Sequence, residues 1–109
     1  MAGLSAADGG GLVEFAARVL ALAPLSEASR RRTEELWLRE LVLAADGDAA
    51  LERAAYARLV EIAPELDFAL NNYAWILQAA RESLPRALAL AERAVARRPD
   101  EPAYAHTLA

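Results

Sequence analysis

Three apolar segments of this chain end in a proline that follows the same kind of phrase. The phrases are VLALAP at 19–24, VEIAP at 60–64 and VARRP at 95–99. Proline cannot continue a helix, because it lacks the backbone N–H and its ring clashes with the preceding turn. Before the first proline, apolar residues recur at positions 12, 15, 16, 19, 20 and 23, which is helical spacing. The pattern predicts a chain built from helices that are stopped at defined points.

Composition favours an all-α fold for the same chain. Of its 109 residues 56% are apolar, glycine and proline number five each, and β-branched residues, which favour strands, are scarce. The net charge of −4 argues against a general nucleic-acid binder, which needs a basic face to displace counterions from phosphates. The abundance of alanine and arginine, with no lysine, suggests a GC-rich bacterial genome.

Turn signals divide the chain into a flexible leader and a helical domain. We expect the leader at 1–10 and one domain at 11–109. The expected helices are approximately 12–23, 33–45, 49–63, 67–80 and 84–98, with the start of another at 102–109. Gly47 suits the left-handed end of a helix, and Asp48 suits the N-cap of the next one.

Polar residues in the turns have local explanations. We expect Ser29 or Thr33 to cap the helix at 33–45, and Ser83 to cap the helix at 84–98. The run Arg30-Arg31-Arg32 precedes Glu34 and Glu35 at the spacing of helical ion pairs. This spacing favours a solvated, self-neutralising face over an anion-binding site.

The segment 69–99 resembles a tetratricopeptide repeat. Its first helix carries large and small residues in the family's order, at Leu70, Tyr73, Ala74 and Leu77. Small residues suited to the helix crossing follow at Ala87, Ala91 and Ala94, and Pro99 is the terminal proline. Pro64 and Pro99 lie 35 positions apart, close to the family's period of about 34 residues. The resemblance implies an α-solenoid of antiparallel helix pairs, in which Leu108 and Ala109 belong to the next repeat.

A second stripe on the helix at 67–80 supplies the candidate binding residues. The resemblance implies that the first helix of each pair lines a concave groove, so this stripe would face it. The candidates for contact with a peptide or partner segment are Phe68, Asn71, Asn72, Trp75 and Gln78. Amides offer donors and acceptors to a peptide backbone, and tryptophan is enriched in binding hot spots. The alternative is structural: Trp75 packs against a neighbouring repeat, and Asn72 bonds a nearby carbonyl.

Little in the sequence indicates an enzyme. His106 is the only histidine and there is no cysteine, so neither a metal site nor a thiol nucleophile is expected. The serines lie in the leader or in turns, where capping explains them. We therefore expect no catalytic residues, no metal and no cofactor.

These observations predict a non-catalytic protein–protein interaction module. The alternative is a structural, self-associating domain, forming a homodimer through the uncapped end of the solenoid, or a fragment of a longer repeat scaffold. No signal peptide is recognisable, and no apolar run approaches the roughly 20 residues that span a bilayer. The expected location is cytoplasmic, and the partner is expected to be a protein or peptide.

Overall fold

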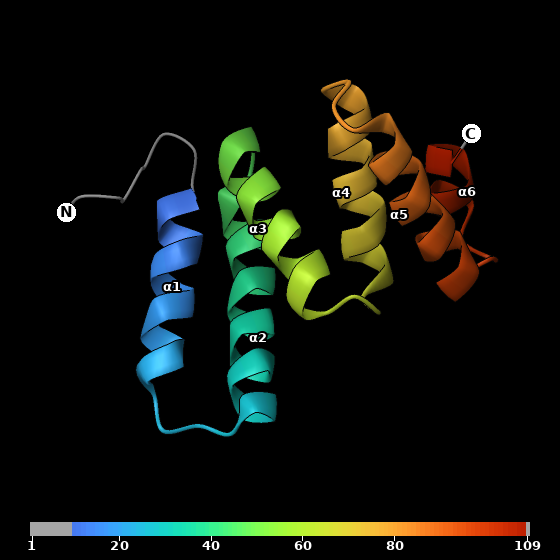
Figure 1. Ribbon diagram of the computed structural model, residues 1–109. Coiled ribbons are helices and arrows are strands. Elements are labelled where there is room, and N and C mark those ends of the chain that lie inside the picture. Colours follow the sequence, from blue (N-terminus) through green and yellow to red (C-terminus); the bar gives the residue numbers. More distant parts are fainter. Residues whose placement is uncertain (1–9, 109) are drawn as a thin grey trace. The chain divides into compact units, whose positions relative to one another are not determined.

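The computed structural model describes residues 10–108, which contain helices and turns but no strand (Figure 1). The all-α class predicted from the sequence is therefore confirmed for these residues. The predicted leader lies, up to residue 9, outside the described residues. The helices are α1 Gly10–Leu22, α2 Glu27–Ala45, α3 Ala49–Ile62, α4 Asp67–Ala79, α5 Leu84–Arg97 and α6 Pro102–Leu108. The chain divides into two units, Met1–Ile62 and Ala63–Ala109.

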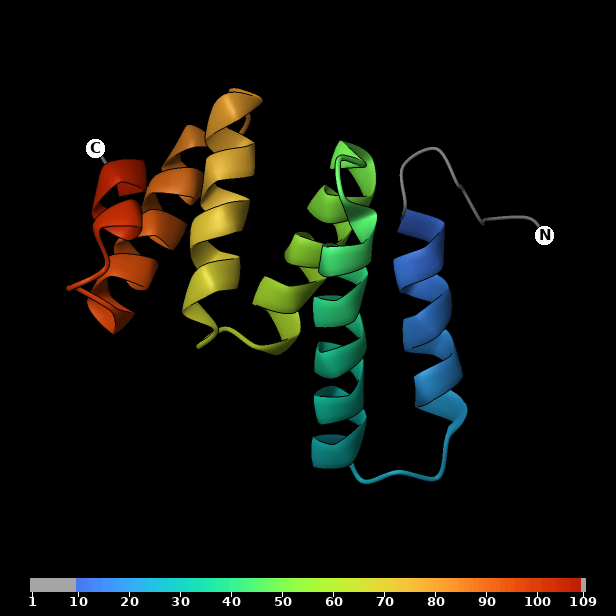
Figure 2. The ribbon, with the colours of Figure 1, turned by 180° about the vertical axis from the view of Figure 1, so that it is seen from behind.

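The N-terminal unit is a helix hairpin with a third helix beside it. α2 and α3 pack against each other, and α1 contacts both (Figures 1 and 2). Leu38 and Leu59 are completely buried in this unit. The turn between α2 and α3 is built as predicted, because Gly47 has a left-handed φ of 91° and Asp48 Oδ1 accepts a hydrogen bond from Leu51 N at 3.1 Å.

α2 starts earlier than the sequence pattern predicts. The helix begins at Glu27 rather than at residue 33, and its N-cap is Ser26, whose side chain accepts a hydrogen bond from Ser29 N. The predicted caps Ser29 and Thr33 are therefore wrong, since both lie inside the helix. The first turns of α2 are polar and exposed, so they carry no apolar face that would mark them as helical.

Arg30 ties the first turns of α2 to the end of α1. Its guanidinium donates to the carbonyl oxygens of Leu20 at 2.9 Å and Leu25 at 3.0 Å, and more weakly to that of Ala23 at 3.4 Å. Carbonyls at the end of a helix lack intrahelical partners, so a cation that binds them stabilises the terminus. Part of the arginine run is thus a structural clamp between helices.

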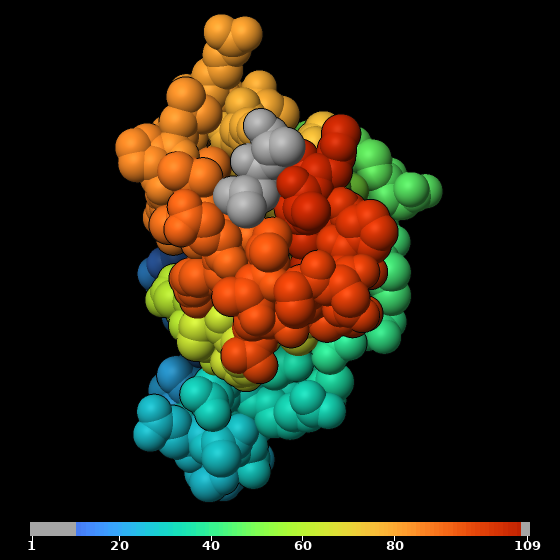
Figure 3. All heavy atoms as spheres, turned by 90° about the vertical axis from the view of Figure 1, so that its right-hand side faces the viewer, coloured from blue at the N-terminus to red at the C-terminus, as the bar shows by residue number. Residues whose placement is uncertain are grey.

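In the C-terminal unit α4 and α5 form a hairpin, and α6 packs on α5 while also contacting α4. Figure 3 shows the face of the molecule on which α5 and α6 lie side by side. The residues predicted to form the interior of this hairpin are all buried: Leu70, Tyr73, Ala74, Leu77, Ala87, Ala91 and Ala94.

Ser83 occupies the N-cap position of α5 as predicted, but without the side-chain hydrogen bond of a cap. It adopts a left-handed backbone with φ of 44°, and Arg81 in the same turn has φ of 58°. Left-handed conformations are unfavourable for residues that carry a Cβ. The turn is therefore closed by backbone geometry that the capping pattern does not reveal.

Candidate functional site

One stripe of α4 faces α6. It consists of Asp67, Asn71, Ala74 and Gln78, which follow the spacing i, i+4, i+7 and i+11 and therefore lie on one side of the helix. Both ends of the stripe meet α6. The Tyr104 hydroxyl donates to Asp67 Oδ2 at 2.6 Å, and Gln78 lines a cavity together with Thr107. Asn71 and Ala74 lie between these two points.

The Asp67–Tyr104 hydrogen bond is partly shielded from water. Tyr104 is buried, and the carboxylate of Asp67 also lies 4.0 Å from Nη1 of Arg98. Burial, followed by the hydrogen bond to Asp67 and that residue's charge, raises the pKa of Tyr104 to about 12. A phenol beside a carboxylate keeps its proton more strongly, because ionisation would place two negative charges together where water is partly excluded.

This raised pKa predicts a loss of stability at high pH. Between the ordinary tyrosine pKa of 10.0 and the folded value of about 12, the unfolded chain releases the Tyr104 proton while the folded chain keeps it. Stability falls wherever the unfolded state binds fewer protons, so the contribution of Tyr104 is complete below pH 10 and decreases above it. Urea unfolding of the wild type and of Tyr104→Phe across this pH range tests the direction of the effect. The unfolding free energy of the wild type should fall more steeply with rising pH than that of Tyr104→Phe. Parallel pH profiles would contradict the assignment.

Asn71 is buried at the middle of the stripe. Its side chain is 7% exposed, its Nδ2 makes only a long contact of 3.4 Å to Asn72 Oδ1, and its Oδ1 has no hydrogen-bond partner. A buried acceptor without a donor costs about 1–3 kcal/mol. The structure thus places Asn71 inside the C-terminal unit rather than on its surface.

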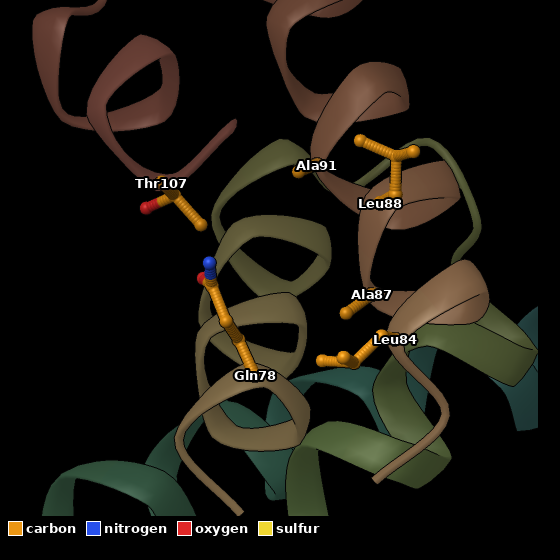
Figure 4. Close-up of a pocket in the computed structure, with 6 residues that line it drawn as sticks. All are labelled: Gln78, Leu84, Ala87, Leu88, Ala91 and Thr107. Carbon is orange, nitrogen blue, oxygen red and sulfur yellow. The ribbon is translucent and has the colours of Figure 1, made fainter. Parts of the chain in front are cut away.

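A small cavity opens where α4, α5 and α6 meet (Figure 4). Its volume is about 140 Å³. The apolar part of its wall comes from α5, and Gln78 and Thr107 lie on the opposite side, where the hydroxyl of Thr107 points away from the cavity. The lining residues are Gln78, Leu84, Ala87, Leu88, Ala91 and Thr107. Thr107 Oγ1 donates to Ala103 O at 3.0 Å, within α6.

Trp75 lies on α4 one turn before Gln78, and its side chain is 59% exposed. Of the residues predicted to bind a partner, Trp75 and Gln78 reach the surface, Phe68 and Asn72 are half-buried, and Asn71 is buried. The five residues therefore do not form one continuous accessible stripe. The sequence pattern did not predict the apolar cavity wall to which Leu84 and Leu88 belong. These two residues nevertheless have helical spacing and lie outside the buried alanine face.

The described residues contain no cluster of three or more histidine, cysteine, aspartate or glutamate side chains that could hold a metal ion. His106 is exposed on α6. None of the described helices is both long and apolar enough to cross a membrane. No protein-family model, no curated protein and no solved structure matches the chain.

Proposed function

We propose that the chain is a protein-binding module made of tetratricopeptide-like helix pairs arranged as a solenoid. In this proposal a partner segment binds to the C-terminal unit across α4, α5 and α6. The observation that carries the proposal is the exposed Trp75 on the helix whose next turn borders an apolar cavity. Exposed aromatic residues near apolar depressions are typical of binding hot spots.

The size and lining of the cavity favour a side chain over a metabolite. Small-molecule sites usually have volumes of about 300–1,000 Å³ and several convergent polar groups. The cavity here is about 140 Å³, and most of its lining residues are apolar. An apolar side chain of the partner would displace water from Leu84 and Leu88. The amide of Gln78 would then be available to the partner's backbone, because amides both donate and accept.

Trp75 and Gln78 are the residues proposed to touch the partner directly. Phe68, Asn71 and Asn72 are less accessible, so we assign them no direct contact with the partner. An aromatic ring anchors a partner at low entropic cost, because only two side-chain torsions become fixed. Trp75 therefore supplies most of the proposed affinity, and Gln78 supplies orientation.

Replacing Trp75 tests this proposal. Peptides would be selected from a random library against the whole chain, and their affinities for the wild type and Trp75→Ala compared by calorimetry. We expect Trp75→Ala to weaken binding by about 30-fold, the effect of losing a hot spot of about 2 kcal/mol. Its unfolding free energy should change by less than about 1 kcal/mol, because the ring is mostly exposed.

Leu43→Ala is the matched control, because Leu43 is 75% exposed on α2 in the N-terminal unit. It should leave peptide affinity unchanged. Leu88→Glu should weaken binding as strongly as Trp75→Ala, since it puts a charge at the apolar wall. Equal affinity of the wild type and both C-terminal variants, with intact helical circular dichroism, would reject this surface as the binding site.

A further inference from the structure

α6 lies over a polar group of α4 that it does not satisfy. Asn71 belongs to the stripe of α4 whose two ends meet α6, at Asp67 and at Gln78. Its Oδ1 is buried and has no hydrogen-bond partner. Folded proteins pair nearly all of their buried polar atoms, so an orphaned acceptor calls for an explanation. At this point α6 excludes water from the amide of Asn71 without replacing the hydrogen bond that water would supply.

The contact is also incompletely filled at the C-terminal end of the stripe. A space of about 140 Å³ remains where α4, α5 and α6 meet. Thr107 of α6 borders this space, but its hydroxyl points away and donates to Ala103 O within α6 (Figure 4). Side chains beside unfilled space lose the dispersion contacts that close packing supplies. α6 therefore neither fills the space beside Gln78 nor gives a donor to Asn71.

A short hydrogen bond ties α6 to the N-terminal end of α4. The Tyr104 hydroxyl donates to Asp67 Oδ2 at 2.6 Å, and Nη1 of Arg98, just before α6, lies 4.0 Å from the same oxygen. The ring of Tyr104 is buried, so packing holds the same residue in place. The hydroxyl can be removed while the ring stays, which makes the tie separable from the packing by mutation.

We propose that α6 is a displaceable helix that competes with the partner for the α4–α5 hairpin, and that a donor on the partner pairs with Asn71 Oδ1 once α6 has left. This inference rests on the proposed function and adds the regulation of that site. With α6 in place, Trp75 and Gln78 are the residues of α4 that reach a partner. With α6 displaced, Asn71 joins them on an accessible face. Because the partner then gains its full contact only with the open fraction of molecules, α6 lowers the observed affinity.

Hydrogen exchange of the whole chain measures this displacement. Amide exchange would be followed by NMR with and without a saturating peptide, selected on the wild type and shown to depend on Trp75. We expect the peptide to accelerate exchange at residues 104–107 by at least about tenfold, because so short a helix is unstable without its packing. Exchange in α4 should become slower, since the peptide covers it.

Removing the tie should favour the open state. Tyr104→Phe deletes the hydrogen bond to Asp67 and keeps the aromatic ring. Loss of a hydrogen bond to a carboxylate shifts such an equilibrium by about tenfold, so this variant should bind the peptide about tenfold more tightly than the wild type. Without peptide, residues 104–107 should exchange faster. Tyr56→Phe is the matched control, because Tyr56 is similarly buried in the N-terminal unit. It should bind like the wild type.

Replacing Asn71 should have the opposite effect. Asn71→Leu keeps the branching of the side chain and removes the orphaned acceptor, so α6 should pack better on α4. We expect slower exchange at residues 104–107 and peptide binding at least about tenfold weaker, because the partner loses its acceptor and displaces a better-seated helix. A purely structural Asn71 predicts no change in peptide affinity.

Each measurement has an outcome that overturns its part of the proposal. Unchanged or slower exchange at residues 104–107 in a complex that depends on Trp75 rejects displacement of α6 and leaves the proposed function intact. Wild-type peptide affinity of Tyr104→Phe, with faster exchange at 104–107, rejects competition. Wild-type affinity of Asn71→Leu, shown to be folded by circular dichroism, rejects the pairing with Asn71. Peptides that bind without depending on Trp75 reject the proposed function and this inference with it.

Discussion

Replacing Leu70 by alanine is expected to lower the free energy of unfolding of the C-terminal unit by about 3–4 kcal/mol. Leu70 is fully buried on α4, on the face that carries Tyr73 and Leu77. Truncation to alanine removes apolar atoms from the interior and leaves a cavity that a close-packed core fills only in part. Because domains are only marginally stable, such a loss is a large part of the stability of a unit this small.

The chain provides a convenient probe and control for this measurement. Its tryptophans, Trp37 and Trp75, lie in different units, so urea unfolding followed by fluorescence in a Trp37→Phe background reports on the C-terminal unit. Leu88→Ala is the control, because Leu88 is 50% exposed. It should cost less than about 1 kcal/mol. A similar loss for both variants would contradict the burial that the structure assigns to Leu70.

The second large effect concerns an ion pair between α2 and α3. Glu34 is only 4% exposed, and both of its carboxylate oxygens accept hydrogen bonds from Arg58. The distances are 2.6 Å from Nε and 3.1 Å from Nη2. Arg58 also donates from Nη1 to Glu61 at 2.9 Å. The hydrogen bond that Arg58 donates to Glu34 is the main reason that the pKa of Arg58 is raised, although burial opposes this rise.

Arg58→Met is expected to destabilise the N-terminal unit by about 2–4 kcal/mol. The variant leaves the carboxylate of Glu34 buried without its cation, which is the costly way to break a buried pair. The figure is below that for a fully buried pair, because the Arg58 side chain is about one-third exposed and partly screened by water. A raised pKa on a base stabilises the folded state at every pH below the ordinary arginine range, so the contribution of Arg58 to wild-type stability should not vary near neutral pH.

A double variant separates the cost of a stranded charge from the value of the pair. In Glu34→Leu combined with Arg58→Met, no buried charge is left unpaired, so most of the lost stability should return. Glu61 also loses Arg58 as a partner, but its side chain is 69% exposed and stays solvated. Thermal or urea unfolding, followed by Trp37 fluorescence in a Trp75→Phe background, measures the unfolding free energy of the wild type, of Arg58→Met and of the double variant. If the double variant is as unstable as Arg58→Met alone, the defect comes from lost packing by the arginine stem and not from the buried carboxylate.

The pair also shows where reasoning from local sequence reaches its limit. The sequence predicted that Glu34 and Glu35 neutralise the arginines just before them. Glu35 does so in part, with contacts of 3.4 Å to Arg32 and to Arg39. Glu34 instead turns inward to an arginine 24 positions away, and Arg30 binds backbone carbonyls. Helical spacing reveals which charges are neighbours on one helix, but not which of them another helix covers.

At the candidate site, too, the sequence predicted which residues share a helix face but not which face another helix covers. The helix that carries Asn71, Trp75 and Gln78 was predicted, and so was the separation of these residues from the buried face of Leu70 and Leu77. The position of α6 decided their exposure. It faces the stripe of α4 that includes Asn71, which is buried, while Trp75 remains exposed. A polar residue beside a core face looks the same in sequence whether or not another helix covers it.

The sequence by itself determined the all-α class, most helix ends, and the alanine-rich face on which α5 meets α4. These features depend on short-range physics: proline and glycine stop helices, and side chains three or four positions apart share a face. The tertiary structure alone decided that the apolar residues of α1 lie partly in water, that Glu34 is buried and that leucines of α5 line a cavity. Those outcomes depend on which helix lies beside which, and an apolar face specifies that it needs a neighbour without specifying the neighbour.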